Sequence, residues 1–575
     1  MYVEIKGGYF ETVWHDFFNA YDGNSYKAEV LGGTFNKDPR DNEIRIPEYL
    51  TSVPNADGTW GIIEAVAKVG KNGYATLTEA LAAAKDGDTV ILLTDVNVSE
   101  SIVIEKSVTI DLGGKKISGN TYPVLRIQGD ATVFVTGNGT VINTDYVFVL
   151  GSTDGTSAGY LTVENGYFEG VTTVISVTKG KLTVLGGTFK AAEGEYGYRY
   201  LLNCIDQNYR DGSASIEIMG GIFYGFNPQD NTAEGEGTDF LAPGYYSAYT
   251  ADGYYKVVPV FSFRSSNLLL GNTIGMYFNL NSADLIDGVN YVAVFTIHGT
   301  EYVVPRYDAD GNLNWKVKSE NPAVTGILFE GIAAKEMTIP ISVVVMLGDK
   351  AASTTATDSV KGYVERGIER GIFTAVDMDL VIQMINYGAL AQQSFVYNTT
   401  NLANSGEYAA EVLDEYTRDN GTYTNYLDAT NYYGASLNLE NNIGFNFKFF
   451  ADGLETADKA VITYVNHTGK EFVVEIYASA FGTDYKKERD LTVVHLDTLV
   501  AADARQLLTC KIFDKEGNLL AYAVDSIESY CARAIAGLEA MSADAYAEKN
   551  FKLEFYHALM KYCMAAYDYD PDTKK

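Results

Sequence analysis

The sequence has few cysteines, few histidines and no long apolar run. Its four cysteines, in a chain of 575 residues, form no Cys-x-x-Cys pair, so neither a zinc ribbon nor a dense disulfide scaffold is indicated. The longest apolar stretches, such as residues 341–347, are far shorter than the roughly 18 residues that span a bilayer. Packing must therefore stabilise the fold, and we predict no insertion into a membrane.

Basic residues are also scarce. The chain has 43 Lys and Arg against 75 Asp and Glu, which gives a formal net charge of −32. Such a charge repels nucleic acid and anionic lipid surfaces, so neither is an expected partner. The start of the chain has no basic segment followed by an apolar one, as a secretion signal would have. Met1 stands just before a complete copy of the motif described next, so we interpret the chain as part of a longer protein.

The front of the chain repeats a short motif. An alternating strand runs into Gly-Gly or Asn-Gly, then one residue and Phe, and the five copies are residues 3–10, 28–35, 161–168, 182–189 and 216–223. Leu161 and Val163 alternate with polar residues, which predicts a strand with one buried face. We expect the glycine pair to turn the chain and the Phe to re-enter the interior. Copies stacked in this way form a solenoid, in which each turn buries its apolar face against the next.

Residues 74–89 predict a helix in front of the longer run of turns. Thr76 and Glu79 have the spacing of a capping box, Gly87 is a stop signal, and Leu77, Ala80, Leu81 and Ala84 share one face. Such a helix can cover the open end of a solenoid, whose bare strand edges would otherwise pair with other chains. Short strands at 90–93, 96–98, 101–104 and 108–112 then begin a parallel β-helix.

The stretches 75–81, 86–93 and 109–119, with the repeated Gly-Gly-Thr-Phe, resemble the pectate-lyase-like right-handed β-helices of large extracellular surface proteins from gut Clostridia. The resemblance covers residues 64–260, and residues 1–63 resemble the C-terminal part of a preceding β-helix unit. Segments 46–60 and 240–255 resemble the final strand pair of such a helix. The resemblance implies an extracellular or cell-surface location, with signal and anchor outside this sequence. It implies no single activity, because the scaffold carries enzymes and adhesins alike.

The rear half contains one module twice. Residues 267–278 match 436–447 at an offset of 169, residues 358–363 match 525–530 at 167, and residues 384–387 match 559–562 at 175. Each copy starts with alternating strands, so we predict two β-sandwich-like modules, at 261–397 and 434–575, each ending in a helical pair. Residues 398–433 predict a linker or a long loop, and residues 386–392 resemble a helix in modules of the same clostridial proteins. The predicted fold class is therefore mainly β, a right-handed parallel β-helix followed by two repeated modules.

The histidines and cysteines form no recognisable catalytic motif. The five histidines are His15, His298, His467, His495 and His557, and none belongs to a His-Glu-x-x-His motif. His298 and His467 match at the offset of 169, each beside a Gly/Thr pair that predicts a hairpin turn. We therefore expect a shared structural role for these two. Cys531 and Cys563 lie in predicted helices and are interpreted as small core residues.

Carboxylates of the solenoid are the strongest candidates for an enzyme. Glycoside hydrolysis needs two carboxyl groups about 5 Å or roughly 6.5–9.5 Å apart, and a lyase needs a base beside a bound uronate. The two candidate sets are Asp206 with Asp211 and Arg210, and Glu193 with Glu195 and Arg199. Both sets lie in predicted loops, where solvated charge is the more ordinary interpretation. We predict no cofactor, although the acidic insertion 227–239 offers oxygen ligands that could bind Ca²⁺.

Tyrosine, by contrast, is abundant. The chain has 43, with a cluster at Tyr245, Tyr246, Tyr249, Tyr254 and Tyr255. Tyrosine suits both sugar stacking and protein interfaces, so this cluster is the predicted ligand-binding site, and the alternative is that it seals the end of the solenoid.

The leading functional hypothesis is a non-catalytic, adhesin-like surface protein. It would bind host or dietary glycans, or host proteins such as mucin or immunoglobulin, and the duplicated modules would add avidity. One alternative is a polysaccharide lyase or glycoside hydrolase that acts on the β-helix face, and another is a purely structural stalk. No oligomer is indicated, so a monomer is the default expectation.

Overall fold

The computed structural model describes residues 2–12, 27–42, 45–171, 173–191, 200–270, 273–406, 408, 423–542 and 549–569. The chain forms two compact units. The first is Met1–Phe261 with Leu285–Val289 and Asp349–Ala352, and the second is Ser262–Asp284, Asn290–Gly348 and Ser353–Lys575. Both units are built mainly from β-strands.

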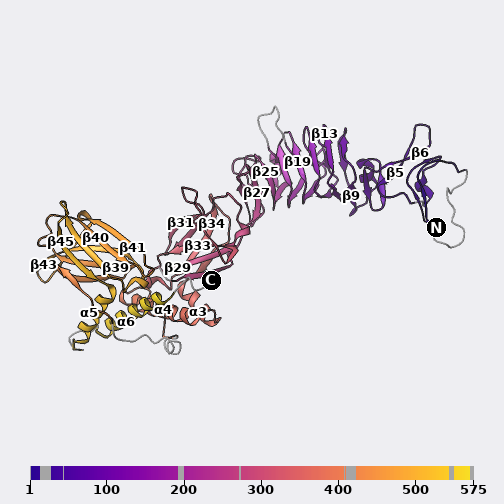
Figure 1. The fold of residues 1–575 in the computed structure, drawn as a ribbon. Helices are drawn as coiled ribbons and strands as arrows, with labels where there is room; N and C mark the ends of the chain where they lie inside the picture. The colour runs from indigo at the N-terminus through magenta and orange to yellow at the C-terminus, as the bar shows by residue number, and fades with distance from the viewer. Residues whose placement is uncertain are drawn as a thin grey trace. The chain divides into compact units, whose positions relative to one another are not determined.

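The first unit contains a β-solenoid whose successive turns supply strands to three parallel sheets (Figure 1). The first sheet contains β9 (Thr89–Leu92), β12 (Val108–Asp111), β15 (Ala131–Thr136), β18 (Gly159–Val163), β21 (Gly180–Val184) and β24 (Ala214–Ile218). The second contains β10 (Val96–Val98), β13 (Lys116–Gly119), β16 (Thr140–Asn143), β19 (Tyr167–Gly170), β22 (Thr188–Ala191) and β25 (Gly221–Tyr224). The third contains β11 (Ile102–Ile104), β14 (Leu125–Ile127), β17 (Phe148–Leu150), β20 (Ile175–Val177) and β23 (Leu202–Cys204). The predicted solenoid is confirmed.

The turns of the solenoid differ in length although their strands stay in register. Thr162 pairs with Thr183, 183 − 162 = 21 residues later, whereas Thr183 pairs with Glu217, 217 − 183 = 34 residues later. The extra residues lie between β22 and β24, where β23 and a short helix intervene. Loops therefore absorb the insertions while the stacked strands stay in place, as in other solenoids.

The phenylalanines of the repeated motif stack inside this unit. The ring centroids of Phe168 and Phe189 lie 5.3 Å apart with the planes at 19°, and those of Phe189 and Phe223 lie 5.1 Å apart at 8°. All three side chains are fully buried. Phe10 and Phe35 repeat the stacking at 5.0 Å in the front segment. The prediction that the Phe re-enters the interior is confirmed for Phe35, Phe168, Phe189 and Phe223, whereas Phe10 is only partly buried. The rings form two stacks, one in the front segment and one in the solenoid.

The glycine pair of the motif is required by close approach between turns. Gly187 has a φ of +96°, a conformation that residues with a Cβ rarely adopt. Its neighbour Gly186 has no room for a side chain, because a Cβ there would lie 2.3 Å from the carbonyl oxygen of Glu164 in the turn before.

The open end of the solenoid is covered by a helix and a hairpin. Helix α1 (Leu77–Ala83) buries Leu77, Ala80 and Leu81, and the Thr76 hydroxyl accepts a hydrogen bond from the Glu79 amide at 3.1 Å. The helix is shorter than the predicted range 74–89, because the backbone is already extended at Ala84. A hairpin of β7 (Ala67–Val69) and β8 (Asn72–Tyr74) pairs antiparallel with β9. This hairpin covers the strand edge that would otherwise be open to other chains.

An antiparallel hairpin also closes the other end. Strands β26 (Tyr245–Tyr249) and β27 (Tyr254–Pro259) form the hairpin, and β27 pairs with β25. The front segment repeats this arrangement on a smaller scale. There β1 (Tyr2–Ile5) pairs in parallel with β3 (Lys27–Val30), and β2 (Tyr9–Phe10) with β4 (Thr34–Phe35), before β6 (Trp60–Glu64) and β5 (Leu50–Pro54) form the antiparallel pair on β4. Both segments predicted to resemble closing strand pairs therefore contribute to such pairs.

The second unit contains the same arrangement of two sheets twice, in a sandwich-like form. In copy 1 the sheets are β28 (Ser265–Leu269), β29 (Gly275–Asn281), β33 (Asn321–Glu330) and β32 (Lys316–Lys318), and β31 (Thr300–Pro305), β30 (Val292–Ile297), β34 (Ile341–Leu347) and β36 (Ala356–Asp358). In copy 2 they are β38 (Tyr432–Asn438), β39 (Ile443–Phe450), β43 (Arg489–Leu499) and β42 (Gly482–Lys486), and β41 (Glu471–Tyr477), β40 (Ala457–Val465), β44 (Leu508–Asp514), β45 (Leu519–Asp525) and β37 (Asp428–Thr430). Copy 1 continues into helices α3 (Val360–Glu369) and α4 (Ala375–Ser394), and copy 2 into α5 (Ile527–Glu539) and α6 (Lys549–Asp568) (Figure 1).

The first helix of each copy is attached to its sheets in the same way. In copy 2 the Ser526 hydroxyl accepts a hydrogen bond from the amide of Ser529 at 3.0 Å, and the buried Asp525 carboxylate accepts one from Arg533 Nη2 at 2.6 Å. In copy 1 the equivalent Asp358 carboxylate forms the same ion pair with Arg366. The matched segments 358–363 and 525–530 therefore supply the helix N-cap and the aspartate of the ion pair, and the arginines follow at the same offset, 533 − 366 = 167.

Part of the predicted linker 398–433 belongs to the second copy. Strand β37 pairs with β45, and β38 begins at Tyr432. Earlier in the same segment, the side chain of Gln392 in α4 binds the backbone of Ala403 through a 2.7 Å hydrogen bond. Residues 407 and 409–422 lie outside the described part of the chain.

Candidate functional site

The predicted tyrosine cluster divides between the interior and the surface. Tyr246 is 1% exposed, and Tyr245 and Tyr255 pack against the solenoid core. Tyr249 is 57% exposed, with its ring 4.9 Å from that of Tyr255, and Tyr254 is partly exposed. Tyr245 and Tyr255 therefore contribute to sealing the end of the solenoid, whereas Tyr246 is buried against Phe261. Ligand binding by the cluster stays a prediction, and Tyr249 and Tyr254 are the members with exposed surface.

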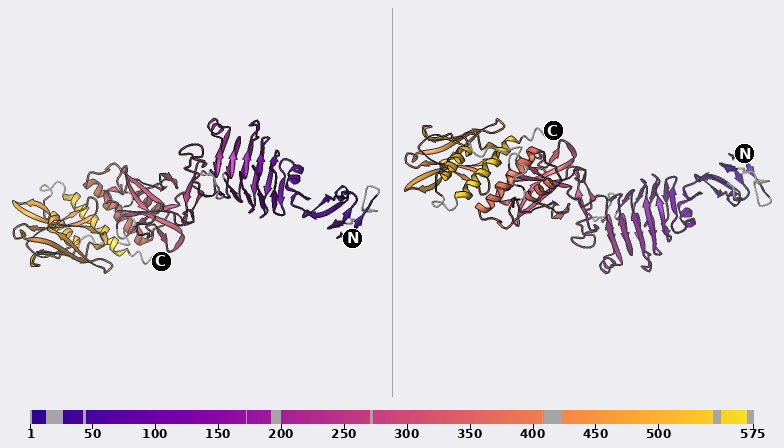
Figure 2. Two further views of the ribbon diagram at one scale, coloured as in Figure 1. Left: turned by 90° about the horizontal axis from the view of Figure 1, so that it is seen from above. Right: turned by 90° about the horizontal axis from the view of Figure 1, so that it is seen from below.

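Two further tyrosines, Tyr167 on β19 and Tyr224 on β25, extend this surface along the second sheet. Figure 2 shows the stacked strands of the solenoid side by side. Tyr224 pairs across the strands with Tyr254, and their ring centroids lie 5.4 Å apart. Glu169, Lys190 and Tyr224 are register partners on β19, β22 and β25. We call the outward-facing residues of these strands the tyrosine face: Tyr167, Glu169, Lys190, Tyr224 and Tyr254. Alternation could have revealed Tyr167 and Tyr224, because each directly adjoins a Phe of the buried stack and must therefore point outward.

The tyrosine face combines aromatic surface with charge. The hydroxyl of Tyr167 donates a hydrogen bond to the Glu169 carboxylate. Burial raises the pKa of Tyr167, and this hydrogen bond raises it further, so the phenol stays protonated and keeps Glu169 in a fixed orientation. Flat rings beside a fixed acceptor and a lysine ammonium are the groups that bind the C–H faces and the hydroxyls of sugars.

In the first predicted carboxylate set, Asp206 and Asp211 each bind a different neighbouring residue. Asp206 and Arg210 lie one turn apart on the short helix α2 (Asp206–Asp211), and form an exposed ion pair at 3.9 Å. Hydrogen bonding to the Ser213 side chain lowers the pKa of Asp211, and the hydrogen bond that its carboxylate accepts from the Ser213 amide at 2.9 Å lowers it further. The other predicted set, Glu193, Glu195 and Arg199, lies outside the described residues.

Glu234, in the acidic insertion 227–239, is a more perturbed carboxylate. Its Oε1 accepts a hydrogen bond from the Cys204 amide at 2.5 Å, whereas its Oε2 is buried and has no hydrogen-bond partner among the described residues. Burial raises the pKa of Glu234, and the charge of Asp206 raises it further, while the Cys204 amide and Arg210 lower it. Folding thus brings Glu234 near α2, which the sequence alone could not show because the two lie on different loops.

The rest of insertion 227–239 uses its oxygens locally. Asn231 Oδ1 accepts a hydrogen bond from the Ala233 amide at 3.0 Å, and Asp239 Oδ1 from the Leu241 amide at 2.9 Å. No group of three or more His, Cys, Asp and Glu side chains that could hold a metal ion occurs among the described residues. Ca²⁺ binding by this insertion therefore stays a prediction.

The two matched histidines lie in the same hairpin of each copy but make different contacts. His298 occupies a two-residue turn with a φ of +52°, and its Nε2 forms a hydrogen bond with the Tyr397 hydroxyl. His467 lies in a longer turn, and its Nδ1 is 2.7 Å from Asp503 Oδ1.

The four cysteines are buried and free, and burial raises the pKa of the Cys204, Cys510, Cys531 and Cys563 thiols. The thiolate, which is the nucleophilic form, is therefore disfavoured. His15 lies outside the described part of the chain.

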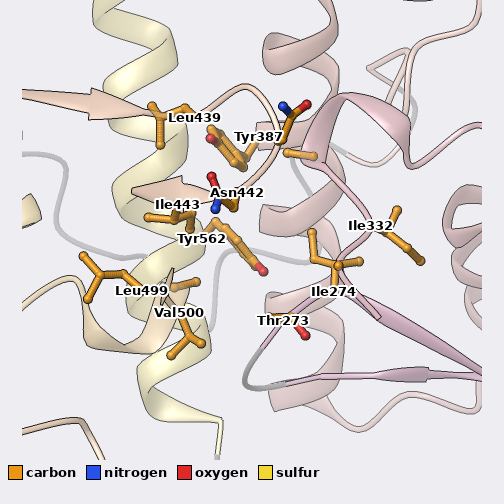
Figure 3. Close-up of a pocket in the computed structure, with 14 residues that line it drawn as sticks. Thr273, Ile274, Ile332, Tyr387, Leu439, Asn442, Ile443, Leu499, Val500 and Tyr562 are labelled. Atoms are coloured by element: carbon orange, nitrogen blue, oxygen red, sulfur yellow. The ribbon is translucent and has the colours of Figure 1, made fainter. Parts of the chain in front are cut away.

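The second unit has a small, partly open cavity between its two copies (Figure 3). The cavity measures about 70 Å³, and equivalent residues of the two copies line it: Ile274 and Ile443, Ile332 and Leu499, Ala334 and Ala501, Tyr387 and Tyr562. The rings of Tyr387 and Tyr562 stack with 5.8 Å between centroids. Binding pockets for small molecules usually measure about 300–1,000 Å³. This cavity is therefore a packing feature of the interface between copies, which resembles the isologous contact of a homodimer.

No protein-family model matches the chain, and no curated protein is similar to it. Among the described residues, none of the helices combines the length and the apolar character that crossing a membrane requires.

Proposed function

We propose that this protein is a secreted or cell-surface protein of an anaerobic bacterium that binds glycans without cleaving them. Its solenoid would be a right-handed β-helix of the pectate-lyase-like type, and the tyrosine face would be its binding surface. The main support is the Tyr224–Tyr254 pair, with ring centroids 5.4 Å apart on an outward-facing sheet surface. Exposed aromatic rings that already pack against each other lose little conformational entropy when a ligand stacks on them.

We propose that the bound glycan comes from the host or from its diet. A rigid, flat face suits an extended polysaccharide or a mucin glycan chain, which can lie along several strands. Host proteins such as immunoglobulin would use the same aromatic groups as anchor residues. An array that contains neutral and acidic glycans, mucin and immunoglobulin therefore tests each of these proposed partners.

Substitution of the paired tyrosines tests the proposal. We expect Tyr224→Ala combined with Tyr254→Ala to weaken binding to the array by about tenfold or more, as loss of a central aromatic anchor does. The matched control is Tyr302→Ala, which removes a tyrosine of similar exposure, 46%, from β31 of the second unit. Unchanged binding by the double variant would contradict the proposal, and absence of binding by the unaltered protein would favour a purely structural stalk.

A second candidate function, polysaccharide cleavage on the solenoid, rests on Glu234. Its raised pKa and the nearby charge of Asp206 are the pattern of a general acid beside an ionised carboxylate. The test is release of reducing ends from uronate-containing and neutral polysaccharides. The protein is an enzyme if Glu234→Gln abolishes turnover. The control is Asp252→Asn, in an exposed turn of the same unit, which should leave turnover intact. This result would exclude a purely binding role.

A further inference from the structure

A pocket of copy 1 gathers three arginines in a strongly acidic chain. The pocket measures about 230 Å³, and its walls include Arg264, Arg366, Arg370, Ser266, Tyr363 and Ile372. The formal net charge of the chain is −32, yet no carboxylate of the described residues lines this pocket. The site is separate from the tyrosine face, which belongs to the first unit.

One of these arginines has a structural ion pair, and the other two have no acidic partner in the described part of the chain. Arg366 Nη2 pairs with the buried Asp358 carboxylate, which also accepts a hydrogen bond from the Ser266 hydroxyl. Arg370 ends helix α3 one turn beyond Arg366 and is exposed. Arg264 precedes β28, where its amide donates to the Asn279 carbonyl oxygen at 2.7 Å. Within the described ranges, neither Arg264 nor Arg370 forms an ion pair.

Copy 2 shows which arginines the module needs for folding. Asp525 and Arg533 preserve the buried ion pair, so Arg366 has a structural explanation. At the matched offsets, Tyr433 stands in place of Arg264 and Gly537 in place of Arg370. The module therefore folds without these two arginines, and their convergence in copy 1 places uncompensated positive charge beside a cavity.

We infer that this pocket binds the oxyanion of an acidic saccharide, either a sulfate ester or a carboxylate. Planar guanidinium groups donate paired hydrogen bonds to such oxygens, and these charge-assisted bonds are among the strongest in proteins. The Tyr363 ring and the exposed Ile372 side chain supply apolar surface for the sugar ring. A volume of about 230 Å³ suits one substituted sugar residue. The inference does not depend on the tyrosine face.

Calorimetric titration of the full chain at low ionic strength tests the inference. The probes are N-acetylglucosamine 6-sulfate, glucuronic acid, neutral N-acetylglucosamine and inorganic sulfate. We expect at least one of the two charged sugars to bind, with the comparison identifying which oxyanion is preferred, and the neutral sugar not to bind measurably. Arg264→Gln combined with Arg370→Gln should weaken binding by at least about tenfold. Added salt should weaken binding to the unaltered protein, because the attraction is between exposed charges.

Two controls keep the test decisive. Arg45→Gln removes an arginine whose side chain is 73% exposed in the first unit, and it should leave the affinity unchanged. Arg370→Gly introduces the residue that copy 2 already has at this position, so loss of binding with an unchanged unfolding temperature identifies a lost contact. Full affinity in the double Gln variant, equal binding of the neutral sugar, or inorganic sulfate binding as tightly as the sulfated sugar would each overturn the inference. The two sites are tested separately. The double Gln variant should lose binding to the acidic sugars but keep the glycan binding of the tyrosine face, and the Tyr224→Ala, Tyr254→Ala variant should show the opposite pattern.

Discussion

Gly7 and Gly186 occupy the same position of the repeated motif but have different surroundings. A Cβ on Gly186 would lie 2.3 Å from the Glu164 carbonyl oxygen, whereas a Cβ on Gly7 would meet no atom within 4 Å. We expect Gly186→Ala to lower the free energy of unfolding by about 1–3 kcal/mol, the usual cost of forcing extra atoms into a packed site. Gly7→Ala should change it by less than about 0.5 kcal/mol. Urea unfolding measures both variants, and equal losses would contradict the stacking of these turns.

The raised pKa of Glu234 predicts a pH-dependent stability. A carboxyl whose pKa is higher in the folded protein than in the unfolded chain stabilises the fold below its ordinary pKa and ceases to do so as the pH rises through its folded value. Glu234→Gln retains an acceptor for the Cys204 amide but cannot ionise. We expect this variant to be more stable than the parent at pH 7, by less than about 1 kcal/mol because the site is partly exposed. The difference should vanish below pH 4, and thermal unfolding across this range measures it.

Residues whose role follows from alternation could be predicted, and those whose role follows from loop contacts could not. The buried Phe168, Phe189 and Phe223 follow from their place after the glycine pair. By the same alternation Tyr224 must face outward, but the sequence analysis grouped tyrosines by proximity along the chain and selected Tyr246, which is buried. Glu234 could not be singled out, because its pKa depends on its burial and on Cys204 of β23 and Asp206 of α2, which are distant in the sequence.

At the scale of elements, one buried ion pair attaches the first helix of each copy to its sheets. Removing Arg533 leaves the Asp525 carboxylate, which is fully buried, without its cation. We expect Arg533→Ala to destabilise the protein by about 3 kcal/mol, the cost of an uncompensated buried charge. Burial raises the pKa of Asp525 while Arg533 lowers it, so the carboxyl becomes neutral more readily without the arginine. The loss should therefore shrink at acidic pH.

Chemical unfolding at pH 7 and pH 4 measures this effect. The control is Lys459→Ala, which removes one partner of the exposed Lys459–Glu475 pair and should cost less than about 1 kcal/mol. An equal loss for Arg533→Ala at both pH values would show that the arginine contributes packing instead of charge.

Elements defined by a repeated pattern were predictable, and their exact ends were not. The repeated glycine-rich motif predicts the solenoid strands, and the resemblance of segments 46–60 and 240–255 to closing strand pairs predicts the hairpins. Helix α1 ends at Ala83, before the predicted stop at Gly87, because Lys85 and Asp88 form a turn through a 2.8 Å hydrogen bond. The composition of residues 428–433 predicts part of a linker. In the structure they belong to β37 and β38, whose pairing with β45 and β39 overrides that local preference.

At the scale of the whole molecule, the duplication was visible in the sequence but its consequence was not. In the sequence, Leu380, Met384, Tyr387 and Leu390 recur at near-helical spacing, which predicts core packing for this stripe of α4. In the structure that stripe also contacts α6 of the other copy, where Tyr387 stacks on its counterpart Tyr562. A single sequence shows that a face is apolar but does not show which surface covers it. Equivalent residues on both sides of the interface are what gene duplication of a self-associating module would produce.

This contact predicts that the two copies unfold together. Tyr562 is buried and stacks on Tyr387, so Tyr562→Ala should cost about 3–5 kcal/mol, as other large-to-small aromatic substitutions in cores do. We expect amide hydrogen exchange to show reduced protection in β30 of copy 1 as well as in β40 of copy 2. Tyr477→Ala, at a side chain that is 58% exposed, should change neither. Protection lost in copy 2 alone would show that the copies are independent folding units that merely touch, because a shared core transmits the loss of one wall to both sides.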